Sequence, residues 1–135
     1  MAEITLQAVV SSIPNATGFI EGELEAVGCP LKTQMQIDVA VDEVFTNIAS
    51  YAYGDEGGSA TIRFEFDPET RTVEITFTDS GVPFDPMTMK DPDVTLSAEE
   101  RPIGGLGIFL VKKTMDSVSY QYRDGQNQLT IRKKI

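Results

Sequence analysis

Residues 60–77 read ATIRFEFDPETRTVEITF and contain two runs, Ala60–Phe66 and Thr72–Phe77, in which apolar and polar residues alternate. Alternation with a period of two is typical of strands that bury one face. The link Asp67–Arg71 is short enough to close a hairpin between the two runs. The stretch therefore predicts two antiparallel strands whose shared apolar face covers a core.

The segment before this hairpin predicts one strand and two helices. Apolar and polar residues alternate over residues 3–10, which predicts a first strand. The pair Pro14-Asn15 predicts a turn and a helix start, and this helix is expected to end at Gly28. A longer helix is expected from Leu31 to a stop at Gly54, because its apolar residues keep close to a period of 3.6: Met35, Ile37, Val41, Val44, Ile48 and Ala52.

The segment after Asp79 begins with a stretch that is rich in Pro, Asp and Glu and lacks a periodic apolar face. Loops of this length are uncommon inside a compact domain and are usually functional or disordered. We expect such a loop at about residues 82–103. The Gly104–Gly107 segment then predicts the start of a third helix, and residues 118–122 and 128–132 predict a closing hairpin.

The order of these predicted elements is strand, two helices, hairpin, long loop, helix and hairpin. This order does not alternate strands and helices regularly enough for a parallel doubly wound sheet. An α/β (α+β) two-layer sandwich on a largely antiparallel or mixed sheet fits it better. With 135 residues, the chain has the usual size of one domain, residues 1–135, around one hydrophobic core.

The composition excludes several classes of function. The 11 Lys and Arg against 21 Asp and Glu give a net charge of −10, so we expect the chain to bind neither nucleic acid nor a membrane surface. A single cysteine cannot form a disulfide within the chain, and without histidine the usual zinc ligand sets and a Ser-His-Asp arrangement are impossible. Carboxylates must therefore carry any proton transfer. Because the sequence has no long apolar run and no leader pattern, the expected location is the cytoplasm.

The first candidate for chemistry is the pair Glu43 and Asn47 in the long helix. Their i, i+4 spacing places both side chains on one helix face. A carboxylate accepts a proton or orients a water molecule, and an amide oxygen is a suitable ligand for Mg²⁺ when phosphate oxygens and water complete its shell. A solvated helix face is the commoner explanation of such a pair when it stands alone.

Two glycine-containing segments are further candidates. Asp79 ends a strand and can accept a hydrogen bond from an amino group such as that of adenine, while Gly81 lets the backbone approach a flat ligand. The Gly104–Gly107 segment offers unhindered backbone amides at a helix start, which favour a phosphate, and Arg101 adds a cation close by. The alternatives are an ordinary turn, a glycine hinge and a solvated arginine.

The order of these three motifs resembles that of a known family. Residues 43–53 (EVFTNIASYAY) are similar to the N box, residues 79–86 (DSGVPFDP) to the first glycine box, and residues 104–113 (GGLGIFLVKK) to the second glycine box of the GHKL ATPase superfamily. Within the superfamily, the chain most resembles the anti-sigma-factor serine/threonine kinases of bacterial partner-switching systems, the RsbW and SpoIIAB type. The resemblance covers nearly the whole chain and extends to residues 127–130.

The resemblance implies ATP and Mg²⁺ as cofactors and a role for each motif residue. Glu43 would be the general base for a target hydroxyl, Asn47 the Mg²⁺ ligand and Asp79 the acceptor of the adenine amino group. Thr130 would assist Asp79. The other nucleotide-binding residues implied are Gly81 beside the base, Gly104, Gly105, Leu106 and Gly107 around the phosphates, and Arg101 toward a terminal phosphate. The implied fold is the Bergerat fold, a sheet with helices layered on one face.

The implied function is an anti-sigma factor and serine/threonine-protein kinase. It would transfer the γ-phosphoryl group of Mg-ATP to a STAS-type antagonist, sequester a sigma factor and form a homodimer. The lack of histidine and the short chain exclude a histidine kinase acting on itself. Two alternatives remain open: a nucleotide-dependent regulatory binding module without significant kinase activity, and an interaction domain that binds no nucleotide. Residues 95–101 lack the Thr-Thr-Lys stretch of the sporulation type, so the expected nucleotide lid at about residues 82–103 departs from the pattern.

Overall fold

The computed structural model describes residues 1–88 and 105–135, and the side chains of residues 1–87 and 107–135. Arg101, Gly104 and the part of the expected lid beyond residue 88 lie outside the described residues. The described elements are β1 (Ala2–Gln7), α1 (Ile13–Ala26), α2 (Leu31–Tyr51), β2 (Ser59–Asp67), β3 (Thr72–Asp79), α3 (Gly105–Thr114), β4 (Ser117–Arg123) and β5 (Gln126–Lys134), with short 3₁₀ turns η1 (Val10–Ser12) and η2 (Pro86–Thr88).

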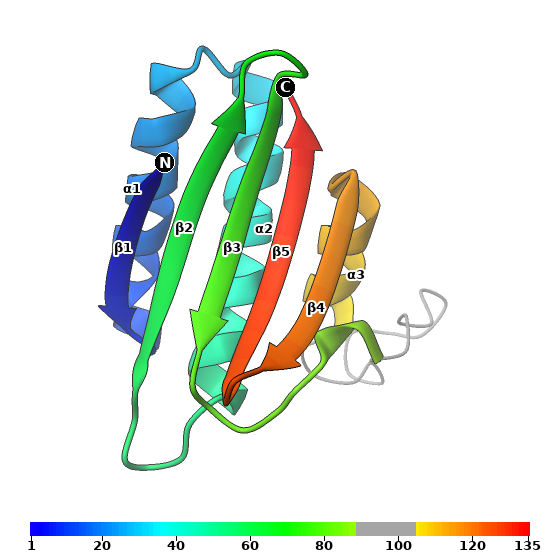
Figure 1. The fold of residues 1–135 in the computed structure, drawn as a ribbon. Helices are drawn as coiled ribbons and strands as arrows, with labels where there is room; N and C mark the ends of the chain where they lie inside the picture. Colours follow the sequence, from blue (N-terminus) through cyan, green and yellow to red (C-terminus); the bar gives the residue numbers. More distant parts are fainter. Residues whose placement is uncertain (89–104) are drawn as a thin grey trace.

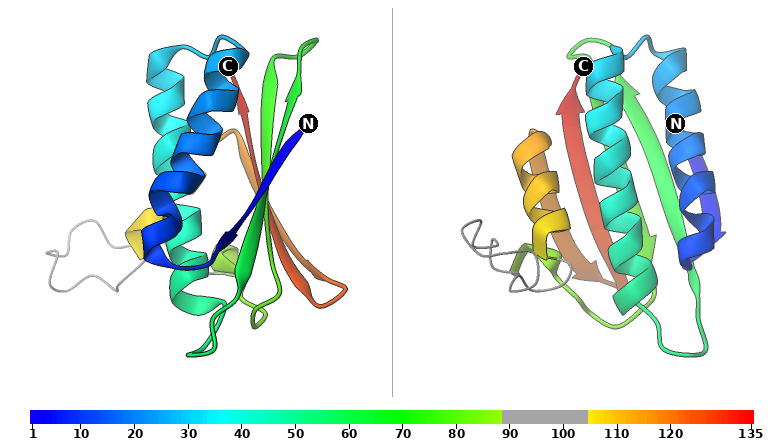
Figure 2. Two further views of the ribbon diagram at one scale, coloured as in Figure 1. Left: turned by 90° about the vertical axis from the view of Figure 1, so that its left-hand side faces the viewer. Right: turned by 180° about the vertical axis from the view of Figure 1, so that it is seen from behind.

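These strands form one sheet in the order β1-β2-β3-β5-β4, and every described strand pair is antiparallel (Figure 1). The helices α1, α2 and α3 form a layer on one face of this sheet (Figure 2). The predicted two-layer α/β sandwich is therefore confirmed. Where the sequence left an antiparallel and a mixed sheet open, the described strands form a wholly antiparallel one.

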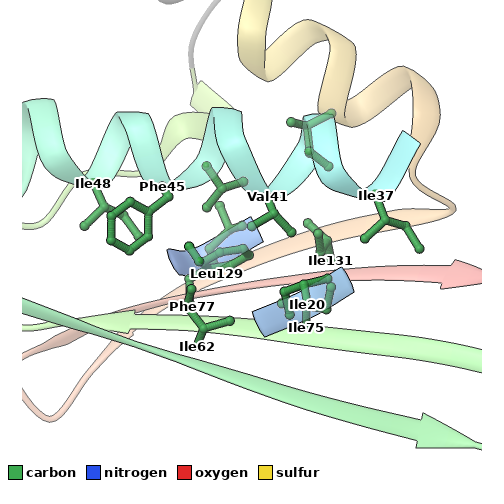
Figure 3. Packing of buried hydrophobic residues seen from close by; sticks show 14 of the residues in the cluster. Ile20, Ile37, Val41, Phe45, Ile48, Ile62, Ile75, Phe77, Leu129 and Ile131 are labelled. Atoms are coloured by element: carbon green, nitrogen blue, oxygen red, sulfur yellow. The ribbon is translucent and has the colours of Figure 1, made fainter. Parts of the chain in front are cut away.

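The hydrophobic core lies between the helix layer and the inner face of the sheet (Figure 3). Burial alternates along β3, so Ile75 and Phe77 face the helices while Thr76 between them does not. From the helix side, α2 contributes Ile37, Val41 and Phe45, which are fully buried. Each such side chain stabilises the fold by about 1.5–3 kcal/mol relative to its exposed state. This core holds α2 firmly across the sheet.

Three details of the sequence expectation were wrong. β1 ends at Gln7 rather than at residue 10, because the chain leaves the sheet there and turns into η1. Pro14 lies in the first turn of α1 rather than in a turn before it, a position where a missing amide hydrogen costs no helical bond. Met35 is 60% exposed, because the buried face of α2 is centred on Ile37 and Val41.

The closing β4–β5 hairpin is confirmed, and its turn positions the candidate site. Asp124 and Gly125 both have positive φ, 55° and 77°, as a two-residue type I′ turn requires. On its other side, β5 pairs with β3, and this register places Asn127 opposite Asp79. Among the described helices, none has the length and hydropathy needed to cross a membrane.

Candidate functional site

A narrow pocket opens between α2, the sheet and α3. Its walls are mainly apolar and aromatic, and three side chains supply amide or carboxylate groups: Asn47, Asp79 and Asn127. Tyr51 and Phe84 close one wall, with their rings stacked at a centroid distance of 5.0 Å. Apolar walls with a few polar groups suit a flat heterocycle.

The sequence-predicted pair Asp79 and Gly81 lies at the end of β3, at this pocket. The carboxylate Oδ1 of Asp79 accepts a 2.9 Å hydrogen bond from the Gly81 amide. A β-carbon built on Gly81 would overlap the carbonyl group of Ala52 at the end of α2, and the next amide, that of Val82, donates to the same carbonyl at 2.8 Å. Glycine is therefore required at position 81 because the loop after β3 packs directly on the end of α2.

Asn127 is the polar centre of the pocket, a role that was not predicted from the sequence. Its amide nitrogen donates to Asp79 Oδ1 and to the carbonyl of Val82, both at 2.9 Å. Its amide oxygen accepts from the Phe84 amide at 3.1 Å and from the Tyr120 hydroxyl. Asn127 thus ties the loop after β3 to β5. The signal that could have found it was its place at the start of the last strand, two residues after the Asp124-Gly125 turn.

Tyr120 reaches Asn127 from the edge strand β4 and lines the same pocket. Burial raises the pKa of its hydroxyl, and the nearby carboxylates of Asp85 and Asp79 act in the same direction. The hydroxyl is therefore protonated at neutral pH and remains a hydrogen-bond donor to Asn127.

The expectation that Thr130 assists Asp79 is wrong for this fold. Thr130 lies on β5, but burial alternates along that strand, so Thr130 faces the side of the sheet opposite the helices. Its hydroxyl pairs with Thr76 at 3.2 Å on that side. The contact with Asp79 is made by Asn127, because a residue an odd number of positions away on a strand points to the other face.

Glu43 lies one helical turn before Asn47 on α2, and its carboxylate packs against the start of α3. A β-carbon built on Gly107 would overlap Oε2 of Glu43, so the absence of a side chain at 107 makes room for this carboxylate. Burial raises the pKa of Glu43 above its ordinary value of 4.5, and the neighbouring Asp42 carboxylate raises it further. A carboxylate with a raised pKa is a stronger base, which suits proton abstraction.

Asn47 has a buried amide nitrogen without a hydrogen-bond partner among the described residues, and its side chain lines the pocket. This nitrogen is a hydrogen-bond donor, so an acceptor on a ligand, such as a phosphate oxygen, would complete its bonding, while the amide oxygen is the atom that could bind a cation. No group of three or more Cys, Asp or Glu side chains in the described part of the chain could hold a metal ion. A Mg²⁺ ion held by Asn47 would therefore take its other ligands from phosphate oxygens and water, the usual arrangement for this ion.

The predicted helix start at the second glycine segment is confirmed for residues 105–107 of α3. Gly105, Leu106 and Gly107 are the first three residues of this ten-residue helix. The amide groups of a first helical turn have no partner within the helix and favour an anion such as phosphate. The structure thus brings Glu43, Asn47, Asp79, Gly81 and Gly107 around the facing ends of α2, α3 and β3.

Comparison with known proteins places the chain in a family. The family model described as a histidine kinase-like ATPase domain matches residues 6–133. The serine/threonine-protein kinase BtrW of Bordetella bronchiseptica is 31% identical over 74% of this chain and 70% of its own length. The serine-protein kinase RsbW of Listeria monocytogenes is 32% identical over 78% of this chain and 69% of its own length.

Solved structures share the fold at low sequence identity. The SiaB-SiaC complex from Pseudomonas aeruginosa contains a chain with a TM-score of 0.58 and 16% identity, covering 98% of this chain and 89% of that one. A histidine kinase domain from Erythrobacter litoralis has a TM-score of 0.57 and 16% identity, covering 93% of this chain and 60% of that one. The chain belongs to the histidine kinase-like ATPase family, and within it to the branch that contains the RsbW serine-protein kinases.

Proposed function

We propose that this chain is an ATP-dependent serine/threonine-protein kinase that phosphorylates a STAS-type anti-sigma-factor antagonist. The observation that carries the proposal is the arrangement of Glu43, Asn47 and Asp79. Asp79 lies at a mainly apolar pocket, Asn47 lines the same pocket, and Glu43 lies one turn before Asn47 on α2, against Gly107. The site thus offers an acceptor for a base, a ligand for a cation and a proton acceptor in one row.

Each group has a chemical task in this proposal. Bound Mg-ATP would supply the γ-phosphoryl group and the cation that offsets its charge. Asp79 accepts a hydrogen bond from the amino group of the adenine ring, and Asn127 holds its carboxylate in place. Asn47 offers an amide oxygen to the cation. Glu43 accepts the proton of the serine or threonine hydroxyl as it attacks phosphorus.

The partners complete the proposal. The named relatives are serine or serine/threonine kinases, which supports a protein hydroxyl as the acceptor. A sigma factor would be held by the same chain, which would act as a homodimer in the cytoplasm. Among the described strands, β1 lies at the edge of the sheet and pairs with β2 alone, which makes it a candidate for such an interface. Sedimentation of the purified protein tests the homodimer directly.

Calorimetric titration with ATP, with and without Mg²⁺, tests the site first. Micromolar binding that depends on Mg²⁺ is expected. The protein is then incubated with Mg-ATP and a purified STAS-domain antagonist, and the phosphate on the antagonist is measured by mass spectrometry. Transfer by the wild type and its loss in Glu43→Ala support the kinase. A nucleotide-dependent complex without any transfer would instead establish a regulatory binding module. If ATP produces neither heat of binding nor a shift in the melting temperature, the chain is an interaction domain that binds no nucleotide.

A further inference from the structure

α2 carries a row of exposed apolar side chains that the pocket does not use. Leu31, Met35 and Val39 are 71%, 60% and 47% exposed. Their i, i+4, i+8 spacing places them in one row along the helix, hereafter the α2 stripe. Single exposed apolar residues are ordinary on a protein surface, but a continuous row of them marks an interaction site.

The next two positions of the same row are Glu43 and Asn47. Rows of this spacing are inclined to the helix axis, so the row winds from the outer face of α2 toward α3. Exposure falls along it from Leu31 to Val39. Glu43 then packs on Gly107, and Asn47 lines the pocket. The α2 stripe therefore leads from solvent to the carboxylate that the proposed reaction uses.

α3 adds one apolar side chain beside this row. α2 and α3 pack side by side and run in opposite directions (Figures 1 and 2). Leu110, which is 37% exposed, lies one turn after Gly107 on α3, and Val39 lies one turn before Glu43 on α2. Because the helices are antiparallel, Val39 and Leu110 are displaced in the same direction along the helix axes from the contact between Glu43 and Gly107.

We infer that the α2 stripe, together with Leu110, is the docking surface for the protein substrate. The occupant is a folded segment that presents its serine or threonine hydroxyl beside apolar side chains. This inference rests on the proposed function, since a protein hydroxyl must approach Glu43 from solvent and the α2 stripe ends at that residue. The charge around Glu43 also indicates which residues flank the acceptor hydroxyl. Asp42 is exposed beside Glu43 and the chain carries a net charge of −10, so the acceptor segment has neutral or basic residues next to its hydroxyl.

The test compares a stripe variant with a matched control. Leu31→Gln/Met35→Gln replaces two exposed apolar side chains by polar ones of good helix propensity. Val10→Gln makes the same kind of change at a side chain that is 64% exposed but lies in η1, outside the stripe. A purified STAS-domain antagonist is the probe. Its binding is measured by calorimetry with Mg-ADP, and its phosphorylation is measured with Mg-ATP.

The stripe variant is expected to weaken antagonist binding and to raise the KM for the antagonist about tenfold, the loss of a modest interface contact. Its affinity for ATP and its melting temperature should equal those of the wild type, and Val10→Gln should behave as the wild type throughout. Loss of binding by the stripe variant supports the inference even if the wild type transfers no phosphate, in which case only the kinase proposal fails.

Other results would overturn the inference. Transfer by the stripe variant with an unchanged KM would leave the kinase proposal intact and remove the docking surface. A change in ATP affinity would show that the α2 stripe serves nucleotide binding, and a change in sedimentation would show that it covers a second copy of the chain. A wild type that binds no STAS-domain antagonist would overturn the inference together with the proposed substrate.

Discussion

The amide nitrogen of Asn127 on β5 donates a 2.9 Å hydrogen bond to Oδ1 of Asp79, its register partner on β3. The same oxygen accepts the Gly81 amide, so one donor from β5 and one from the loop after β3 fix the carboxylate. Both side chains are only 6% exposed. A buried carboxylate that is oriented in this way can distinguish ligands by the position of their donor groups.

The first prediction concerns this bond. Asn127→Ala removes one of the two donors to Asp79 and the side-chain donor to the carbonyl of Val82, so it should lower the free energy of unfolding by about 1–3 kcal/mol and weaken ATP binding. Urea denaturation and calorimetric titration measure the two effects. Thr130→Val is the control, because Thr130 lies on the other face of the sheet, and it should leave ATP affinity unchanged. Equal ATP affinity in all three proteins would exclude a role for Asn127 in nucleotide binding.

The second prediction concerns the contact between the loop after β3 and the end of α2. Gly81→Ala introduces a β-carbon that overlaps the backbone of Ala52, which cannot move as a flexible side chain would. The expected loss of stability is about 1–3 kcal/mol, measured by thermal unfolding. The matched control is Gly54→Ala, where a β-carbon meets no atom within 4 Å. A Gly81→Ala protein as stable as this control would show that the loop packs elsewhere in solution.

The third prediction concerns Glu43 as the base. Glu43→Ala should bind Mg-ATP as the wild type does and lose about 10²–10⁴-fold in phosphoryl transfer. In the wild type, transfer should fall as the pH drops through a pKa above 4.5, because burial and Asp42 raise the pKa of Glu43 and the protonated acid cannot accept a proton. A pH–rate profile and single-turnover kinetics measure both effects. Transfer by the variant at the wild-type rate would exclude Glu43 as the base.

The fourth prediction concerns stability and pH at the interface of α1 and α2. Burial, together with a hydrogen bond and the charge of Glu21, raises the pKa of Asp38 from 3.8 to about 7. The folded state therefore binds a proton more tightly than the unfolded chain, so this group stabilises the fold fully below pH 3.8 and loses that contribution as the pH rises through 7. Asp38→Asn removes the repulsion between the carboxylates of Asp38 and Glu21, so the variant should be more stable than the wild type at pH 8. The expected gain is only about 1 kcal/mol, because water screens a partly exposed pair.

Urea denaturation at pH 5 and pH 8 measures this effect. The advantage of Asp38→Asn should shrink at pH 5, where the wild-type carboxyl is largely protonated and already pairs with Glu21. A matched control is Asp42→Asn, which changes an exposed carboxylate one turn further along α2. An advantage of Asp38→Asn that is the same at both pH values would exclude a shared proton between Asp38 and Glu21.

Local patterns in the sequence were enough to predict most of the architecture. Period-two alternation predicted both hairpins, and the period of 3.6 predicted α2. A strand or helix that buries one face needs apolar residues at its own structural period, so the sequence shows the pattern directly. The spacing of Glu43 and Asn47 and the glycines at 81 and 107 were readable for the same reason. Their positions along the chain already define their places on a helix face and at the ends of elements.

Contacts between distant segments were decided only by the tertiary structure. Asn127 reaches Asp79 across 48 residues because two strands pair in one register, and the same register turns Thr130 to the opposite face. Likewise, Met35 fits a helical apolar pattern, yet it is exposed because no element of the described chain packs on that side of α2. By itself, the sequence determined which elements form and which residue types could bind a nucleotide. The physical pairing of strands and helices determined which of those residues meet, because register and packing depend on the whole chain rather than on any local window.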